Sequence, residues 1–288
     1  MEAFGGFLLI EPTTRYFQSF FVVKKIYAYE KSEYQEIALV ELEGFGRALV
    51  IDNLIQSTEK DEHIYHESLV HPALALHPNP RRVLVLGGGE GATLREVLKH
   101  NTVREAVMVD IDRVVIEFAK KYLEFMHQGS FNDERVKVVI MDGLKYVKES
   151  ESGVFDVVIM DLTDPYASGI ARPLYSVESF KEIYRILRED GVVVTQAGNS
   201  FFYNKSYDYV YSSVKKVFPI VSEYWVWVPS FAYTCNFVLA SKRYLPEDLS
   251  SREFDQRLKE RGVETKYING RRFRSFIDHG IITGDLEE

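Results

Sequence analysis

The feature that most constrains the fold is the stretch that begins at Val83, because it reads as an apolar strand, a glycine-rich turn and then a helix. From Arg81 onward the same rhythm of strand and helix repeats. We expect strands at 83–86, 106–110, 136–141, 155–161 and 191–196, with helices such as 113–123 and 177–187 between them. This alternation predicts a parallel sheet that helices cover on both faces.

The segments on either side of this region have other patterns. Alternation and turn signals predict antiparallel strands in the first 60 residues, at 20–29, 34–42, 47–51 and 54–57. A helix is expected from about residue 60 to residue 76. We therefore divide the chain into an N-terminal β-strand domain, 1–60, and an α/β domain, 61–288. Near the end, 220–228 and 236–241 predict an antiparallel pair at a sheet edge, and 246–261 predicts a helix.

Composition narrows the classes of function. The formal net charge of −8 argues against nucleic acid as the main partner. The single cysteine, Cys235, excludes an intrachain disulfide and favours a cytoplasmic protein. The N-terminus lacks the basic start of a signal peptide. No apolar run approaches the roughly 18 residues of a membrane span, so we expect no association with a membrane.

The expected strands end in polar or acidic residues, and ligands of open α/β sheets bind at those ends. Gly87 and Gly89 fit a dinucleotide-binding turn. Asp110 follows 23 residues after Gly87, which is the spacing typical of an acid that binds both hydroxyls of a ribose. The ligand is then NAD or an adenosyl sulfonium. Asp142 favours the sulfonium, because a third strand-end acid suits an adenine amino group. Glu90, inside the turn, would repel a pyrophosphate.

Three of these acids are expected around one crevice. Glu90 lies in the glycine turn, and Asp161 and Asp164 lie three residues apart after one strand. At roughly 4 Å and an effective dielectric near 20, each like-charge pair costs about 4 kcal/mol, which disfavours a ligand that carries a carboxylate. Intact S-adenosylmethionine carries one, whereas the decarboxylated form ends in an amine. Glu90 is therefore expected to bind an ammonium group. The alternative is that Asp161 or Asp164 caps a helix or pairs outward.

The chain resembles the polyamine aminopropyltransferases of the spermidine synthase family in six motifs that follow the family order: Tyr34-Gln-Glu-Ile37, Asp61-Glu-His-Ile-Tyr-His-Glu67, Gly87-Gly-Gly-Glu-Gly91, Val109-Asp-Ile-Asp112, Asp142-Gly143 and Asp161-Leu-Thr-Asp-Pro165. Its details are most similar to the thermospermine synthase branch, since Glu90 replaces the usual Asp. Phe231 lacks the hydroxyl of a family tyrosine that contacts the acceptor. The resemblance implies a Rossmann-like, methyltransferase-type, mostly parallel sheet with a small N-terminal antiparallel β domain.

The resemblance also implies the activity and the site. The reaction would transfer an aminopropyl group from decarboxylated S-adenosylmethionine to a polyamine and release 5'-methylthioadenosine, with no bound prosthetic group. The acceptor would be putrescine, another diamine, or spermidine, as in the thermospermine-forming branch. The resemblance implies a homodimer or homotetramer. The co-substrate would contact Gln35, Gly87, Gly89, Glu90, Asp110, Ile111, Asp142 and Gly143. Asp161 would accept the proton beside Tyr65, and the acceptor would contact His66, Glu90, Asp161, Asp164 and Phe231.

Other interpretations stay open at this point. The rivals are a methyltransferase that uses intact S-adenosylmethionine, a non-catalytic polyamine-binding protein and, more distantly, an NAD-dependent reductase. The segment 165–174 reads as a lid over the acceptor or as an ordinary connector. His63 and His66 are three residues apart, a spacing that suits a metal on a helix, but we expect no metal because the other strand ends offer neither His nor Cys.

Overall fold

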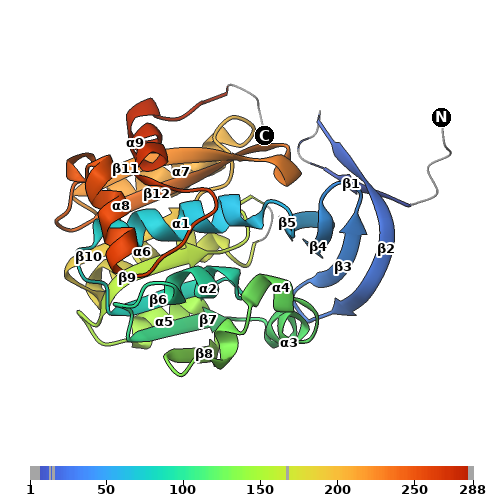
Figure 1. Ribbon diagram of the computed structural model, residues 1–288, viewed down its shortest axis with the longest axis horizontal. Helices are drawn as coiled ribbons and strands as arrows, with labels where there is room; N and C mark the ends of the chain where they lie inside the picture. Colours follow the sequence, from blue (N-terminus) through green and yellow to red (C-terminus); the bar gives the residue numbers. More distant parts are fainter. Residues whose placement is uncertain (1–6, 13, 15–16, 167–168, 285–288) are drawn as a thin grey trace.

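The N-terminal part of the chain forms an antiparallel sheet. The computed structural model describes residues 7–12, 14, 17–166 and 169–284. The N-terminal sheet has its five strands in chain order: β1 (Phe7–Glu11), β2 (Ser19–Lys31), β3 (Glu36–Leu42), β4 (Gly46–Ile51) and β5 (Leu54–Thr58). Each strand is antiparallel to the next. This sheet lies at one end of the molecule, drawn in blue in Figure 1.

The rest of the chain forms a second sheet of seven strands, in the order β11-β12-β10-β9-β6-β7-β8. The strands are β6 (Arg82–Gly87), β7 (Glu105–Asp110), β8 (Val136–Ile140), β9 (Phe155–Asp161), β10 (Leu187–Gln196), β11 (Ile220–Val228) and β12 (Tyr233–Ser241). The five strands from β10 to β8 are parallel, and β12 and β11 form the expected antiparallel edge. The predicted fold class is therefore confirmed.

The strand order reverses beside β6. From β6 the chain goes on to β7 and then β8 on one side, and afterwards returns to β9 on the other side. The register of β6 and β9 sets Gly87 opposite Asp161, at the carboxyl ends of both strands. An open α/β sheet binds its ligands at such a point, because the connections diverge there and leave a crevice.

Helices cover both faces of the second sheet (Figure 1). The helices are α1 (Glu62–Leu76), α2 (Ala92–Leu98), α3 (Arg113–Tyr122), α4 (Glu124–His127), α5 (Gly143–Glu149), α6 (Val177–Ile186), α7 (Asn204–Lys215), α8 (Ser251–Glu260) and α9 (Gly270–His279). Alternate residues of the central strands point to opposite faces: Val83 and Val85 pack in one apolar core, and Leu84 and Leu86 pack in the other. Burial on both faces explains why these strands read as continuous apolar runs.

The N-terminal sheet shares the first of these cores. Buried residues of β3 and β5, such as Ile37 and Ile55, belong to the same cluster as Leu74 of α1 and Val85 of β6. β5 leads almost directly into α1, which starts at Glu62, so the expected helix is confirmed to within two residues at its start. The division into domains 1–60 and 61–288 stays a prediction. No helix in the described part of the chain has the length and apolar character needed to cross a membrane.

Some elements of the C-terminal half differ from those expected. Strand β10 begins at Leu187 rather than at residue 191, and its pairing with β9 is irregular between Leu187 and Val192. The single helix expected at 246–261 is a 3-10 turn, Pro246–Asp248, followed by α8. Ser250 and Glu253 form a capping box that starts α8, which explains the later start. After Gly262, where no pattern in the sequence predicts an element, the chain forms α9.

Candidate active site

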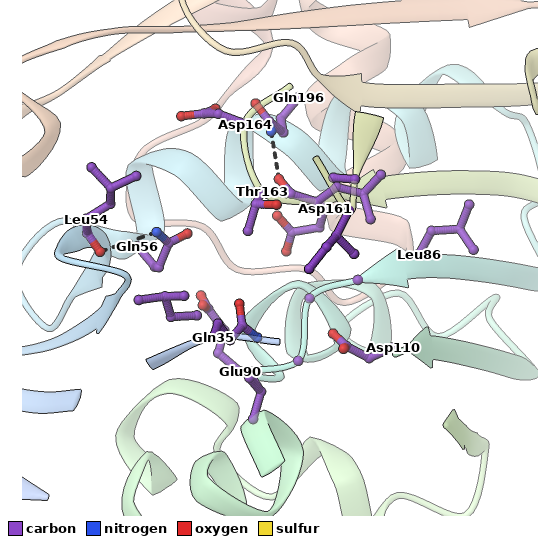
Figure 2. A pocket seen from close by; sticks show the side chains of 18 of the residues that line it. Gln35, Leu54, Gln56, Leu86, Glu90, Asp110, Asp161, Thr163, Asp164 and Gln196 are labelled. Atoms are coloured by element: carbon purple, nitrogen blue, oxygen red, sulfur yellow. Dashed lines mark hydrogen bonds between the residues drawn. The ribbon is translucent and has the colours of Figure 1, made fainter. Parts of the chain in front are cut away.

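A cavity lies between the N-terminal sheet and the carboxyl ends of β6, β7, β8 and β9 (Figure 2). The N-terminal sheet and its loops supply Gln35, Leu49, Ile51, Leu54, Ile55 and Gln56 to its lining. The strand ends supply the glycine turn and the acids Glu90, Asp110, Asp142, Asp161 and Asp164. The structure therefore brings together at one cavity every residue of the predicted site except His66.

The glycine turn brings the end of β6 close to two of the acids. Gly87 has φ +80°, and a Cβ there would lie 2.1 Å from the carbonyl oxygen of Asp161. The next amide, of Gly88, donates a hydrogen bond to that same oxygen at 2.8 Å. A Cβ on Gly89 would lie 2.8 Å from Oδ2 of Asp110. Glycine is required at both positions because the backbone touches its neighbours directly.

One end of the cavity carries the residues predicted to bind the adenosyl group. Asp110 accepts a hydrogen bond from the amide of Asp112 at 2.8 Å, and burial raises the pKa of Asp110 to about 6. The Gln35 amide nitrogen donates to Oδ2 of Asp112 at 3.0 Å, which fixes its side chain beside the strand end. Asp142 caps α5 by accepting from the amide of Lys145 at 2.8 Å. Asp142 therefore both caps this helix and lines the cavity.

Glu90 is held by two polar partners from outside its turn. The Ser57 hydroxyl donates to Oε1 of Glu90 at 3.0 Å, and Nε2 of His66 lies 2.8 Å from the same oxygen. Burial alone would lower the pKa of His66, but Glu62 and Glu90 outweigh it and raise that pKa to about 10. His66 is therefore an imidazolium at neutral pH. Its positive charge partly neutralises Glu90. Glu90 therefore attracts a cationic ligand less strongly than the sequence alone indicated.

His66 is the one predicted site residue that does not line the cavity. Its side chain is 1% exposed and lies behind Glu90, with Nδ1 at 2.8 Å from Oε2 of Glu62. Glu62 in turn accepts from Arg95 at 2.8 Å. The prediction that His66 contacts the acceptor thus differs from the structure. The side chain points away from the cavity and belongs to a buried row of alternating charges, Arg95, Glu62, His66 and Glu90. Sequence reasoning missed this row, although the i, i+4 spacing of Glu62 and His66 is a readable signal.

Asp161 is fixed through both oxygens. The Tyr65 hydroxyl donates to Oδ1 at 2.7 Å, and the Thr93 hydroxyl donates to Oδ2 at 2.6 Å. Burial raises the pKa of Asp161, His66 opposes this effect, and Glu90 adds to it. Sequence reasoning did not single out Thr93. A carboxylate oriented by two hydroxyls, with a raised pKa, is a suitable proton acceptor in a buried cavity.

Asp164 lies on the same loop as Asp161 (Figure 2). Burial raises the pKa of Asp164 to about 6, and hydrogen bonds of Tyr166 and Gln196 oppose that shift. Gln196 at the end of β10 also donates to the carbonyl of Leu162 at 2.6 Å, which ties the loop to the next strand. Asp164 therefore lines the cavity as a partly buried acid and does not cap a helix.

The remaining wall is aromatic and aliphatic. Phe231 is buried, and its ring meets that of Tyr65 edge-on with the centroids 6.0 Å apart. Tyr233 and Cys235 follow it along the wall. In the proposed lid, 165–174, residues 167–168 lie outside the described part of the chain, while Ile170, Ala171 and Leu174 line the cavity. Among the residues that the structure describes, no three His, Cys, Asp or Glu side chains are arranged to hold a metal ion.

Fold and site together define an α/β protein with a methyltransferase-type sheet, whose acidic strand ends face a cavity under an N-terminal antiparallel sheet. The family model described as "Spermine/spermidine synthase domain" matches residues 62–249, and the model described as "Spermidine synthase tetramerisation domain" matches residues 10–59. The chain therefore belongs to the spermine/spermidine synthase family.

Relatives and a solved structure agree with this assignment. A polyamine aminopropyltransferase of Pyrobaculum calidifontis is 56% identical over 269 residues, which covers 93% of each chain. A polyamine aminopropyltransferase of Hyperthermus butylicus is 56% identical over 260 residues, 90% of this chain and 89% of the other. A spermidine synthase solved in complex with the transition state analogue AdoDATO superposes with a TM-score of 0.89 and 32% identity, over 96% of this chain and 94% of the other. The resemblance to the spermidine synthase family that the motifs indicated is confirmed.

Proposed function

We propose that this protein transfers an aminopropyl group from decarboxylated S-adenosylmethionine to a polyamine and releases 5'-methylthioadenosine. The observation that carries the proposal is the pair of hydroxyls, Tyr65 and Thr93, that orient the partly buried Asp161 at the wall of an acidic cavity. The names of the relatives support it, as does the AdoDATO complex of the similar spermidine synthase.

The charge of the cavity supports the choice of donor. The lining carboxyls are those of Asp52, Glu90, Asp110, Asp142, Asp161 and Asp164, and the described lining residues include no Lys, Arg or His. A donor with an intact carboxylate would have no side-chain cation to pair with, whereas an ammonium would meet Glu90. His66 reduces the field of Glu90 without removing its hydrogen-bonding capacity. This electrostatic argument weighs against the methyltransferase alternative.

In the proposed mechanism, Asp110 holds the ribose hydroxyls, with Gln35 and Ile111 beside it, and Asp142 with Gly143 meets the adenine. The acceptor nitrogen attacks the carbon next to the sulfonium, so a C–N bond forms and the C–S bond breaks. The electron pair of the broken bond goes to sulfur, which leaves as a neutral thioether and needs no acid. The nitrogen loses one proton, which Asp161 accepts and later returns to solvent.

The difficult step is to provide an uncharged nitrogen. A primary amine has a pKa near 10.4, so it is almost wholly protonated at neutral pH. The sulfonium nearby lowers the amine pKa by like-charge repulsion, and the raised pKa of Asp161 brings the two values closer. The Tyr65 hydroxyl orients the carboxylate and Asp164 holds a charged part of the acceptor. Positioning of the two reactants supplies much of the remaining rate.

We also propose that the protein forms a homodimer or homotetramer through the N-terminal sheet. The outer surface of β1 and β2 exposes large apolar side chains, among them Phe7 at 75% and Phe20 at 72%. Ile10, at 55%, pairs directly with Phe20 across the two strands. A patch of this kind on a sheet edge marks an interface between chains. The match to a tetramerisation-domain model over residues 10–59 supports this reading.

The direct test is product analysis by chromatography and mass spectrometry. The purified protein receives decarboxylated S-adenosylmethionine with putrescine, cadaverine, agmatine or spermidine, and Asp161→Asn serves as control. We expect equal amounts of 5'-methylthioadenosine and aminopropylated amine, and a large loss in the control. A thermospermine product from spermidine would assign the chain to that branch. Binding without turnover would favour the non-catalytic alternative, and methyl transfer from intact S-adenosylmethionine would favour the methyltransferase.

A further inference from the structure

The turn between β2 and β3 carries two residues of the cavity lining. Tyr34 and Gln35 line the cavity, whereas Ser32, in the same turn, does not. On one side the turn is held by Ile37 of β3, which is fully buried. On the other side no residue of β2 from position 24 to position 31 is buried. Packing of β2 therefore contributes little to the position of this turn relative to the second sheet.

The Ser32 hydroxyl joins this turn to the second sheet. It accepts hydrogen bonds from the backbone amides of Tyr34 and Gln35, each at 3.0 Å, and so shapes the turn from within. It also lies 2.6 Å from Oδ2 of Asp112, just after β7. The carbonyl of Gln35 is a second acceptor within reach, at 3.2 Å. Because the hydroxyl has one hydrogen and the shorter contact is to a charged group, it donates to Asp112.

Asp112 is a buried junction between the two sheets, with an exposed fraction of 1%. Its Oδ2 also accepts a hydrogen bond from Nε2 of Gln35 at 3.0 Å, while Oδ1 accepts from the amide of Val114 and caps α3. The amide of Asp112 donates to Oδ1 of Asp110 at 2.8 Å. The carboxylate that accepts from Ser32 thus also fixes the Gln35 side chain, and its own backbone is bonded to the acid proposed to hold the ribose. The Gln35 amide keeps a second N–H and a carbonyl oxygen with which to contact a ligand.

We propose that Ser32 is a positioning residue for the donor, whose hydroxyl holds Gln35 of the first sheet in place beside Asp110 of the second sheet. The inference rests on the proposed function, aminopropyl transfer. Ser32 does not line the cavity, so it acts through Gln35 rather than by touching the donor. Without the hydroxyl, the amides of Tyr34 and Gln35 lose their acceptor, and the bond from Ser32 to Asp112 is lost.

This role implies a selective effect. The donor should bind less tightly when the turn is released, because Gln35 is no longer held against the end of β7. A bound donor should still react at nearly the same rate, because the carboxylate at the reaction centre, Asp161, is held by other groups, Tyr65 and Thr93. Loss of the Ser32 hydroxyl therefore affects the dissociation constant of the donor and not the chemical step.

The test separates donor binding from acceptor binding and from folding. Ser32→Ala, Ser32→Thr, Gln35→Ala and the double variant Ser32→Ala/Gln35→Ala are compared with the wild-type protein. Calorimetric titration without acceptor gives the dissociation constant of decarboxylated S-adenosylmethionine. Turnover at saturating donor gives kcat and the acceptor KM, and thermal unfolding gives the melting temperature. Ser212→Ala is the matched control, since its hydroxyl donates to the carbonyl of Tyr209 within α7 and does not line the cavity.

We expect Ser32→Ala to raise the donor dissociation constant by roughly tenfold, the lower end of the range for loss of a hydrogen bond to a charged group, with kcat and the acceptor KM within about threefold of the wild-type values. Ser32→Thr keeps the hydroxyl and should bind the donor as the wild-type protein does, and so should Ser212→Ala. The double variant should bind the donor no more weakly than Gln35→Ala alone, because two residues that act through one contact are not additive.

An unchanged donor dissociation constant in Ser32→Ala would overturn the inference. So would a double variant whose loss equals the product of the two single losses, since Ser32 would then act independently of Gln35. An equal rise in the acceptor KM, or a lower melting temperature that accounts for the loss, would leave Ser32 a structural role only. Absence of transfer to every amine would overturn the proposed function, whereas the calorimetric comparison needs no turnover and would still decide the role of Ser32. A wild-type protein that does not bind the donor would overturn both.

Discussion

The Tyr65 hydroxyl donates a hydrogen bond to Oδ1 of Asp161 across 2.7 Å, from the first turns of α1 to the end of β9. The two residues are 96 positions apart in the chain. Thr93 binds the other oxygen of the carboxylate. With both oxygens fixed, Asp161 presents its remaining lone pairs to the cavity in one orientation, which is the arrangement needed to accept a proton from a bound amine.

We predict that Asp161→Asn lowers kcat by about 10³-fold, within the range for loss of a general base. The amide keeps an oxygen for the Tyr65 hydroxyl but has no charge to accept the proton. Tyr65→Phe should lower kcat by roughly 10- to 100-fold, because the carboxylate remains but loses one of its two supports. Rates at saturating donor and acceptor provide the measurement. An Asp161→Asn variant within threefold of the wild-type kcat would remove Asp161 from the proposed role.

We predict that His66 stabilises the fold as a buried cation. Its folded-state pKa of about 10 lies above the unfolded value near 6.5. The stabilisation is therefore complete below about pH 6.5 and is lost as the pH rises through about 10. His66→Gln should destabilise the protein by about 3–5 kcal/mol at neutral pH, because Glu62 and Glu90 lose a buried partner.

Urea unfolding between pH 6 and pH 10 measures this effect. The difference in unfolding free energy between the wild-type protein and His66→Gln should shrink as the pH approaches 10. His63→Gln is the matched control, since His63 lies on the same helix, is only partly buried and does not line the cavity. A constant difference across the whole pH range would argue that His66 is neutral in the folded protein.

The site could be predicted from the sequence where it depends on local order. Asp110 and Asp161 end strands that the sequence identifies by their apolar runs, and parallel strands deliver their carboxyl ends to one edge. Gly89 follows from the same logic, because only a turn without a Cβ lets the backbone approach Asp110. These residues follow from strand positions and turn chemistry, without knowledge of how the two sheets pack.

What could not be predicted from the sequence depends on packing between distant segments. Tyr65 and His66 are adjacent, but successive helix residues point about 100° apart, so only the docking of α1 decides which one faces the cavity. Tyr65 faces it and His66 faces Glu62 and Glu90. Glu11 lies on a strand whose other side chains are exposed or partly exposed, and its carboxyl accepts a hydrogen bond from the backbone of Ile55 on β5. No periodicity in 7–11 predicts that contact.

We predict that donor binding weakens below about pH 6. The folded-state pKa of Asp110 is about 6, and protonation removes the anion that would accept the ribose hydroxyls. The dissociation constant of decarboxylated S-adenosylmethionine should rise by about tenfold per pH unit below that value, by proton linkage. Calorimetric titration without acceptor measures it. Asp164→Asn should keep this dependence although Asp164 also titrates near pH 6, whereas Asp110→Asn should bind weakly at every pH.

We predict that two alanine substitutions in the glycine turn have different effects, one on donor binding and the other on folding. In Gly89→Ala the new methyl meets side-chain atoms of Asp110 and Val115, at 2.8 and 2.7 Å, so the protein should fold while the Asp110 carboxyl moves. The donor dissociation constant should then rise by roughly 10- to 100-fold. In Gly87→Ala the methyl meets the backbone oxygen of Asp161 at 2.1 Å with φ at +80°, so folding itself should fail or lose several kcal/mol. Equal melting temperatures for both variants would contradict this distinction.

We predict that Glu11→Gln makes the protein without ligand more stable. The folded-state pKa of Glu11 is about 8, against 4.5 in its ordinary state, so the folded protein holds this proton more tightly. Deprotonation therefore favours the unfolded chain, and the penalty is absent below about pH 4.5, grows up to about pH 8 and is constant above it. Near pH 7 the penalty is on the order of 3 kcal/mol, and the uncharged amide does not incur it.

Thermal unfolding of the wild-type protein and Glu11→Gln from pH 5 to pH 9 checks this prediction. The variant should melt at a higher temperature, by a margin that widens up to about pH 8, as the linkage of that pKa requires. Melting curves that stay parallel with pH would show that Glu11 ionises freely in the folded state.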